Sequence, residues 1–248
     1  MLTKFAMRVV SELTRSDRIE TGRPHRHVLD LLIRHAKTGE QDALSQLYCE
    51  MRHRAISGEQ ITDVYFPAAI DRIGAEWHEC DLDILQASIA LSRLQSLLRE
   101  LGRAWVSDRT GERTGPCILL ALPAQEQHTL GAMIAANQMR RMGVSVRVAL
   151  VPKFGEMQRL LRENRYSAVF VSVSNRSCLA SCADLMKTIR DNSGNELPVV
   201  CGGGIVAEMG QDMSSAQLAS LVGAGLATSN IPEALAYIGG QVKQYAAE

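Results

Sequence analysis

Three short segments of the chain carry the residue types that could do chemistry, and each follows a run of apolar residues. The first contains Glu126 and His128, with Gly131 three residues further on. An imidazole can bind a metal through one ring nitrogen, and a carboxylate that holds the other nitrogen fixes the tautomer and raises the basicity of the ligand. We therefore expect His128 to be a metal ligand supported by Glu126. The alternative is a solvent-exposed histidine near the start of a helix.

The other two segments consist of small residues. Forty residues separate Gly131 from the segment Ser172-Val173-Ser174, and a further 27 separate that segment from Gly202-Gly203-Gly204. Taken alone, the triple glycine predicts a turn between a strand and a helix. A glycine-rich nucleotide-binding loop is disfavoured, because the glycines follow the fourth apolar run rather than the first and no lysine follows them.

These segments stand at the ends of predicted strands. Short apolar runs, typical of strands buried on both faces, cover residues 117–122, 144–150, 168–173, 198–201 and 226–227. Helical periodicity covers residues 128–142, 156–164, 179–190, 213–222 and 231–246. This alternation predicts an α/β fold with a doubly wound, five-stranded parallel sheet of the Rossmann-like, flavodoxin-like kind. Ligands bind such sheets at the carboxyl ends of the strands, where the three segments lie.

The N-terminal half has a different periodicity. From Pro24 to Val106, apolar residues recur at spacings of three and four, with breaks at Gly39 and Gly58. We expect a helical bundle of four helices over residues 26–107, with Pro67 starting or kinking a helix. The polar segment 108–116 holds two glycines and one proline, which predicts a linker to a second domain, 117–248. Residues 1–25 precede the bundle as an N-terminal segment.

The composition argues against several classes of protein. Lys and Arg together number 27, as do Asp and Glu, so the net charge of zero gives no overall sign of a DNA-binding protein. Neither a transmembrane helix nor a signal peptide is predicted, because charged residues interrupt every long apolar stretch. The six cysteines lack paired spacing across short loops, which indicates reduced thiols. We therefore expect a cytoplasmic protein.

The order and spacing of the three segments resemble the cobalamin-binding signature of methionine synthase and its relatives. That signature reads acidic-x-His-x-x-Gly, then Ser-x-Leu or Ser-x-Thr, then Gly-Gly. The resemblance implies cobalamin as the cofactor, with His128 as the lower axial ligand of cobalt, Glu126 as its hydrogen-bond partner and Gly131 allowing close approach to the corrin ring. The run from Gly223 to Thr228 resembles the last strand of that family. The other residues for which the resemblance implies cofactor binding are Thr129, Ser172, Ser174, Gly202, Gly203, Gly204 and Thr228.

The resemblance also implies how the cofactor's dimethylbenzimidazole tail is held. In that family the tail lies between the sheet and the helices. Ser172 would line this slot, Ser174 would hydrogen-bond the tail, and Gly202 and Gly203 would leave room for it. Serine at 174 stands where the family more often has leucine or threonine, a departure that concerns the tail contact and not the slot.

The segment from Pro67 to Ile84 resembles the cap domain that covers the upper corrin face in corrinoid proteins and in light-sensing regulators of the CarH type. The resemblance implies that Trp77 lies over the upper axial ligand, with Ile84 beside it, and that His78 can bind cobalt as a second axial ligand. The alternative for Trp77 is a place in the bundle core.

Two positions of the cap depart from the CarH pattern. CarH-like caps have a Glu-His pair ten residues after the tryptophan, where this chain has Ala87 and Ser88. These residues lack the polar groups that would hold a bulky adenosyl ligand. We therefore expect a preference for hydroxocobalamin, with adenosyl- and methylcobalamin as alternatives.

A cap followed directly by a cobalamin domain resembles the AerR/PpaA antirepressors of photosynthetic bacteria, over residues 40 to 240. The resemblance implies a light-responsive transcription regulator, not an enzyme, that opposes a CrtJ/PpsR-type repressor of photosystem genes. Two alternatives stay open: a corrinoid carrier protein of a methyltransferase system, and a haem-binding sensor of the same fold. No membrane partner is expected, and both the oligomeric state and DNA contact by residues 1–25 are open.

Overall fold

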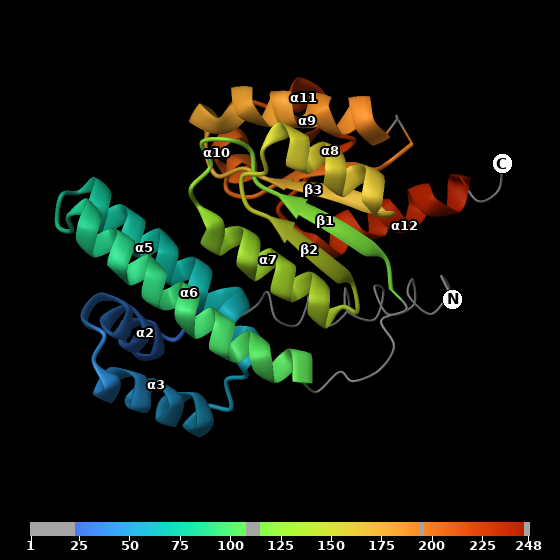
Figure 1. Ribbon diagram of the computed structural model, residues 1–248. Helices are drawn as coiled ribbons and strands as arrows, with labels where there is room; N and C mark the ends of the chain where they lie inside the picture. Colours follow the sequence, from blue (N-terminus) through green and yellow to red (C-terminus); the bar gives the residue numbers. More distant parts are fainter. Residues whose placement is uncertain (1–22, 108–114, 194–195, 246–248) are drawn as a thin grey trace. The chain divides into compact units, whose positions relative to one another are not determined.

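The computed structural model describes residues 23–107, 115–193 and 196–245 (Figure 1). These residues divide into two compact units, a helical unit of residues 23–107 and a sheet unit of residues 115–245. The predicted N-terminal segment and the predicted linker lie outside the described residues, apart from 23–25 and 115–116.

The helical unit has the helices that the periodicity predicts. Helix α2 packs on three of the others, and apolar side chains such as Leu31, Leu47 and Leu94 are buried between them. Both predicted breaks are present: Gly39 ends α2 with a φ of 74°, and the Ser57 hydroxyl caps the next helical segment just before Gly58. In chain order the elements are α2 (Arg26–Thr38), α3 (Gln41–His53), α4 (Gly58–Gln60), η1 (Ile61–Tyr65), α5 (Phe66–His78) and α6 (Ile84–Ser107).

Pro67 lies in the first turn of α5, directly after η1, which is a turn of π-helix. Proline has no backbone N–H, and in the first turn of an α-helix it needs none, because the N–H groups there have no partner within the helix. Phe66 donates its own N–H to the carbonyl of Ile61, five residues earlier. The wider π-helical turn lets the helical segment run on through the proline. Pro67 was expected to start or kink a helix, and the structure shows it at the start of α5.

The sheet unit contains five parallel strands in the order β2-β1-β3-β4-β5. This is the flavodoxin-like order of a doubly wound sheet, so the predicted fold class is confirmed. Each strand lies within two residues of its predicted bounds. The strands are β1 (Cys117–Ala121), β2 (Ser145–Ala149), β3 (Ala168–Ser172), β4 (Val199–Gly202) and β5 (Leu226–Ala227).

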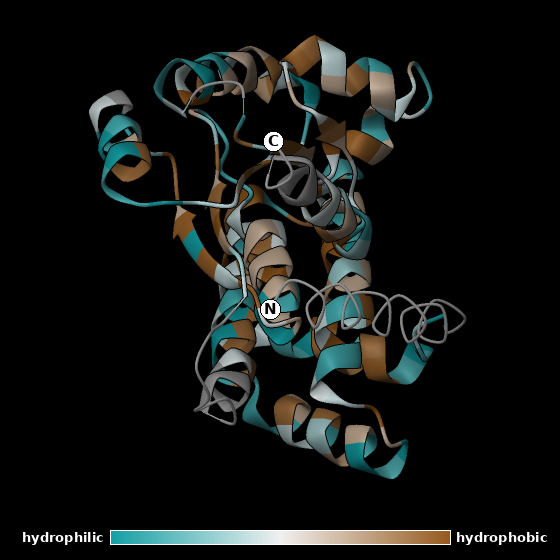
Figure 2. Ribbon diagram, turned by 90° about the vertical axis from the view of Figure 1, so that its right-hand side faces the viewer, coloured by the Kyte–Doolittle hydropathy of each residue, from teal (hydrophilic) through white to brown (hydrophobic). Residues whose placement is uncertain are grey.

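Helices cover both faces of the sheet (Figure 1). Alternate strand residues, such as Leu120 and Phe170, face the layer of α7 and α12, whereas Leu119 and Val171 face the layer of α8, α9 and α11. Figure 2 shows the strands mostly in the hydrophobic colour, as a sheet buried on both faces requires. The helices of the sheet unit are α7 (Thr129–Arg141), α8 (Phe154–Glu163), η2 (Arg176–Cys178), α9 (Leu179–Ser193), α10 (Ile205–Met209), α11 (Ser215–Val222) and α12 (Ile231–Tyr245).

Two short elements, η2 and α10, were not predicted. Both directly follow strand ends, and neither is long enough to show a helical repeat. Among the helices of the described residues, none is long and apolar enough to cross a membrane.

Candidate cofactor-binding site

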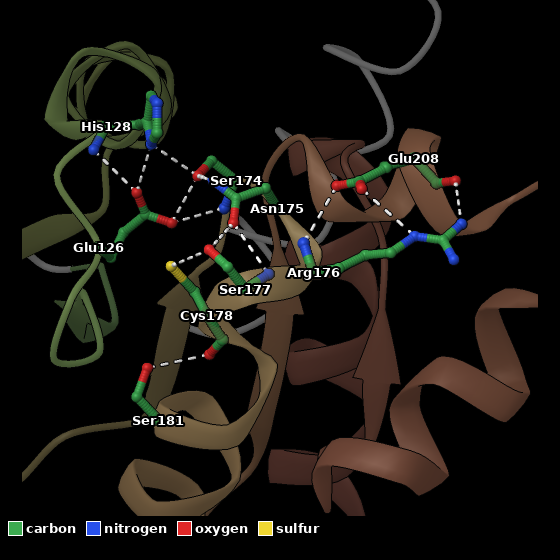
Figure 3. A network of polar contacts seen from close by, with 9 residues as sticks. All are labelled: Glu126, His128, Ser174, Asn175, Arg176, Ser177, Cys178, Ser181 and Glu208. Carbon is green, nitrogen blue, oxygen red and sulfur yellow. Dashed lines mark hydrogen bonds and ion pairs between the residues drawn. The ribbon is translucent and has the colours of Figure 1, made fainter.

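The loop after β1 carries Glu126 and His128 to the carboxyl edge of the sheet. His128 immediately precedes α7, and Glu126 is buried, with only 2% of its surface exposed. Oε1 of Glu126 accepts two hydrogen bonds from His128, one from the backbone N–H and one from ring Nδ1, each 2.8 Å long (Figure 3). The structure therefore has the carboxylate–imidazole contact that the sequence predicts.

The other carboxylate oxygen of Glu126 is held by the loop after β3. Oε2 accepts the backbone N–H and the hydroxyl of Ser174, each at 2.7 Å (Figure 3). Burial alone raises the pKa of Glu126, but the hydrogen bonds from His128 and Ser174 outweigh it and lower the pKa to about 2. Glu126 is therefore a buried, ionised carboxylate whose two oxygens are both occupied.

These contacts fix the orientation of the His128 ring. An ionised carboxylate only accepts hydrogen bonds, so Nδ1 carries the proton, which also points toward Ser174 Oγ at 2.8 Å. The hydrogen bond to Glu126 raises the pKa of His128, and burial offsets part of that rise. The side chain is 59% exposed, and Nε2 has no hydrogen-bond partner in the part of the chain that the structure describes. Histidine ligands of metals have this arrangement.

The loop that carries Ser174 is itself anchored. Asn175 donates to the Ser174 hydroxyl at 3.1 Å, and its side-chain oxygen accepts the backbone N–H of Ser177 at 3.0 Å. Arg176 pairs with Glu208 of α10, with Nε 3.3 Å from Oε1 (Figure 3). None of these residues was expected to contribute to the site. Asparagine two residues before serine is a signal for a local side-chain turn, but nothing in the sequence indicates the partner of Arg176.

Ser174 makes a contact that was not predicted, and its contact with the cofactor's tail stays a prediction. The resemblance implied a contact with the cofactor's tail, whereas the structure directs the hydroxyl hydrogen and the backbone N–H at Glu126. The two residues are 48 positions apart, on loops that follow neighbouring strands. Ser174 is thus placed to hold the carboxylate that orients His128.

The triple glycine packs directly against neighbouring backbone. Gly203 has a φ of 101°, and a Cβ there would lie 2.4 Å from the carbonyl oxygen of Val173. A Cβ on Gly202 or Gly204 would meet carbonyl oxygens of adjacent loops at 2.8 and 2.9 Å. The fold itself therefore requires glycine at these positions. Their role in leaving room for a cofactor tail stays a prediction.

Gly131 has no such reason to be a glycine. It lies on the exposed side of α7, and a Cβ there would meet no atom within 4 Å. Thr129, half-buried, begins the same helix. Ser172 ends β3, half-buried, on the sheet face that carries Phe170 and that α7 and α12 cover. Packing within the protein therefore does not require glycine at 131.

Thr228 follows β5 and is buried. Its hydroxyl donates to the carboxylate of Glu233 and accepts the backbone N–H of Asn230 at 3.0 Å. Both partners lie at the start of α12, so the hydroxyl of Thr228 is used to begin that helix. A contact between Thr228 and a cofactor stays a prediction.

The remaining predicted residues belong to the helical unit. Trp77 and His78 end α5, with ring centroids 4.9 Å apart, and Ile84 begins α6. Trp77 is 42% exposed and Ile84 67% exposed, so the alternative that Trp77 belongs to the bundle core is wrong. Of the two positions that depart from the CarH pattern, Ala87 is buried and Ser88 is exposed.

The donor set at the edge of the sheet suits a metal that brings its other ligands with it. His128 offers ring Nε2 on a side chain that is 59% exposed, and the glycine at 131 leaves open surface on the following helix. Within the described residues, no group of three or more His, Cys, Asp or Glu side chains could hold a metal ion. A flat macrocycle such as corrin or haem supplies its own equatorial nitrogens and needs one or two axial ligands from the protein.

Comparison with known proteins identifies a relative. Over 185 residues the chain is 35% identical to the "uncharacterized 20.5 kDa protein in bchF-crtJ intergenic region" of Rhodobacter capsulatus, a match that spans 75% of this chain and 93% of that protein. This chain belongs to the same protein family. No protein-family model matches the sequence.

Two solved structures were found to be similar to this chain. The monomethylamine corrinoid protein of Methanosarcina barkeri is similar with a TM-score of 0.64 over 87% of this chain and 96% of that one, at 13% identity. A cobalamin-binding protein of Desulfitobacterium hafniense is similar at 15% identity over 86% of this chain and 98% of that one, with a TM-score of 0.43. The first similarity establishes a common fold, and the second is too low to compare the structures further.

Proposed function

We propose that this protein binds cobalamin, with His128 as the lower axial ligand of cobalt. One observation carries the proposal: Nδ1 of His128 donates to the buried carboxylate of Glu126, so Nε2 is the ring nitrogen left for a ligand, on a side chain that is 59% exposed at the carboxyl edge of the sheet. When bound, cobalamin would supply a cobalt centre whose axial ligands can be exchanged. Glu126 would hold the Nδ1 proton and orient the ring, and Ser174 would keep the carboxylate in place.

The surroundings of His128 support this proposal. The open surface at Gly131 would receive the corrin ring, and Ser172 would line the slot for the tail on the sheet face below it. The fold shared with the M. barkeri corrinoid protein is compatible with such a site. The edge of this cofactor site would be completed by Thr129, Gly202, Gly203, Gly204 and Thr228.

In the helical unit, the exposed Trp77 and Ile84 would cover the upper side of the cofactor. His78 would be the second axial ligand. Because Ala87 and Ser88 offer no carboxylate or imidazole to hold an adenosyl group, hydroxocobalamin is the proposed form.

We further propose that the protein is a light-responsive antirepressor that acts on a CrtJ/PpsR-type repressor of photosystem genes. The support is the R. capsulatus relative, whose name assigns it to the bchF-crtJ intergenic region. In its methyl or adenosyl form, cobalamin would supply a cobalt–carbon bond that light can break, and His78 would be available as a ligand in the hydroxocobalamin that forms. The change of ligand would bias the protein between two conformations.

A second candidate is a corrinoid carrier protein of a methyltransferase system. The fold shared with the M. barkeri monomethylamine corrinoid protein favours it. The two candidates use the same His128 site, so binding of cobalamin alone does not separate them.

Binding is tested by adding hydroxo-, methyl- or adenosylcobalamin, or haemin, to the full-length apoprotein in the dark. Dialysis and absorption spectra should show hydroxocobalamin bound tightly, with an imidazole-ligated spectrum. His128→Ala should lose tight binding or that spectrum, whereas His53→Ala, which removes another exposed histidine, should not. Equal binding and equal spectra for wild type and His128→Ala would refute the ligand role. Binding of haemin alone would favour the haem sensor.

The antirepressor and the carrier are separated by their partners. The cobalamin-loaded protein, kept dark or illuminated, is mixed with a purified CrtJ/PpsR-type repressor bound to its operator DNA. Light-dependent release of the repressor supports the antirepressor. Transfer of the methyl group from bound methylcobalamin to a thiol acceptor by an added methyltransferase, which leaves cobalt(I), would support the carrier if the repressor is unaffected.

A further inference from the structure

The loop after β2 presents two exposed apolar side chains on a strained backbone. Leu150 is 50% exposed and Val151 is 41% exposed. Val151 also has a φ of 48°, in the left-handed region that glycine or asparagine occupies readily and a β-branched residue rarely does. Strain of this kind concentrates at ligand-binding sites, where the surrounding structure maintains it.

This loop begins beside the loop that carries His128. Strands β1 and β2 are paired in parallel, and the backbone N–H of Leu122 donates to the carbonyl of Ala149 at 3.1 Å. The His128 loop continues from Leu122, and Leu150 continues from Ala149. Both loops therefore leave the same carboxyl edge of the sheet, on strands about 5 Å apart.

The residues that the cobalamin-binding signature assigns to the cofactor are unevenly distributed about His128. On the side of β3 and β4 lie Ser172, Ser174 and the triple glycine. On the other side, among the residues that the structure describes, the sheet has the single edge strand β2, for which the cobalamin-binding signature assigns no residue. A ring centred on Nε2 of His128 is wider than the spacing between two strands, so it extends over the β2 side as well.

We propose that Leu150 and Val151 form an apolar contact for the rim of the corrin ring on the β2 side of His128. The inference rests on the proposed function, because it requires a corrinoid bound at His128. The rim of a corrin carries methyl groups and the methylene stems of its amide side chains. These groups would cover the two exposed side chains and remove their apolar surface from water.

The test uses two variants of Val151 in the full-length protein. Val151→Gly relieves the backbone strain and removes the side chain, whereas Val151→Ala removes most of the side chain and keeps the strain. Both variants should bind hydroxocobalamin about three- to tenfold more weakly than wild type, as expected for lost apolar contact. Only Val151→Gly should raise the denaturation midpoint of the apoprotein.

Matched control variants distinguish loss of the proposed apolar contact from a general disturbance of the fold. Leu150→Ser should weaken hydroxocobalamin binding as the Val151 variants do. Leu221→Ser changes an apolar residue of α11 that is 57% exposed, and it should leave binding unchanged. Binding is measured by dialysis, and the spectrum of the bound cobalamin is recorded for each variant.

The outcomes distinguish this inference from the proposed function. If wild type binds hydroxocobalamin and the Leu150 and Val151 variants bind it equally well, the loop contact is overturned and the cobalamin site stands. Normal binding of hydroxocobalamin with loss of repressor binding would overturn it too, because the loop would then be a protein contact. If Leu221→Ser weakens binding as much, the contact is not specific and the inference is overturned. If wild type binds no corrinoid, the proposed function itself fails.

Discussion

The carboxylate of Glu126 accepts two hydrogen bonds from Ser174, one from the hydroxyl and one from the backbone N–H, each 2.7 Å long. The two residues lie on loops that follow neighbouring strands, β1 and β3. The hydroxyl bond can be removed by mutation, whereas the backbone bond cannot. The contribution of Ser174 can therefore be measured separately from that of the loop.

Ser174→Ala should destabilise the apoprotein by about 1.5 kcal/mol, because a hydrogen bond to a buried charged group is lost. The bound hydroxocobalamin should also show an altered spectrum, since the orientation of His128 depends on Glu126. Urea unfolding and absorption spectra measure the two effects. Ser174→Thr keeps a hydroxyl and should restore both properties, and Ser96→Ala, on the exposed face of α6, is the control. A spectrum unchanged in Ser174→Ala would contradict the positioning role.

The ionised state of Glu126 predicts a pH dependence of stability in the apoprotein. Its pKa is lowered from an ordinary value of 4.5 to about 2 in the folded protein. A lowered pKa stabilises the fold above the unfolded-state pKa, and this contribution is lost as the pH falls toward 2. Glu126→Gln should therefore be less stable than wild type near neutral pH, by about 3 kcal/mol. Urea unfolding at a series of pH values should show the difference shrinking below about pH 5, and a constant difference would argue against this account.

Gly203→Ala should destabilise the sheet unit strongly. A Cβ at this position would lie 2.4 Å from the carbonyl oxygen of Val173, and the φ of 101° is unfavourable for alanine. The expected loss in free energy of unfolding is about 3 kcal/mol or more, from strain together with the displacement of backbone. Thermal or urea unfolding of the apoprotein measures it. A loss in free energy of unfolding below about 1 kcal/mol would show that the loops after β3 and β4 can separate at little energetic cost.

Gly131→Ala should have opposite effects on stability and binding. A Cβ there meets no protein atom, so the apoprotein should gain up to about 1 kcal/mol from the higher helix propensity of alanine. Hydroxocobalamin should bind more weakly, because the methyl group would occupy the surface proposed for the corrin ring. Gly239→Ala in α12 also places a Cβ in open space, and it should gain stability without any change in binding. If Gly131→Ala binds hydroxocobalamin as tightly as wild type, the corrin ring does not lie against α7 at this position.

His78→Ala tests the second axial ligand. If His78 binds cobalt, the spectrum of the hydroxocobalamin complex should change from that of two imidazole ligands to that of one, while affinity through His128 persists. His35→Ala, in α2, is the control for the removal of another histidine from the helical unit. An identical spectrum in wild type and His78→Ala would leave His128 as the sole protein ligand.

The strands could be predicted from the sequence because a strand buried on both faces is a continuous apolar run, as in Ile118 to Leu122. The contact between Glu126 and His128 could also be predicted, since both residues lie on one short loop. The bonds from Ser174 could not, because they depend on how two separate loops approach each other. The strain at Val151 could not either, because valine gives no signal of positive φ.

The packing of Gly203 and Gly204 against Val173 and Ser174 joins two loops without intervening side chains. Side chains between two segments can absorb a displacement by changing rotamer, but backbone in direct contact cannot. A shift of Ser174 that accompanied the exchange of a ligand at His128 would therefore carry the start of α10 with it. A small displacement of Ser174 would therefore be passed to α10 without being absorbed by side chains between them.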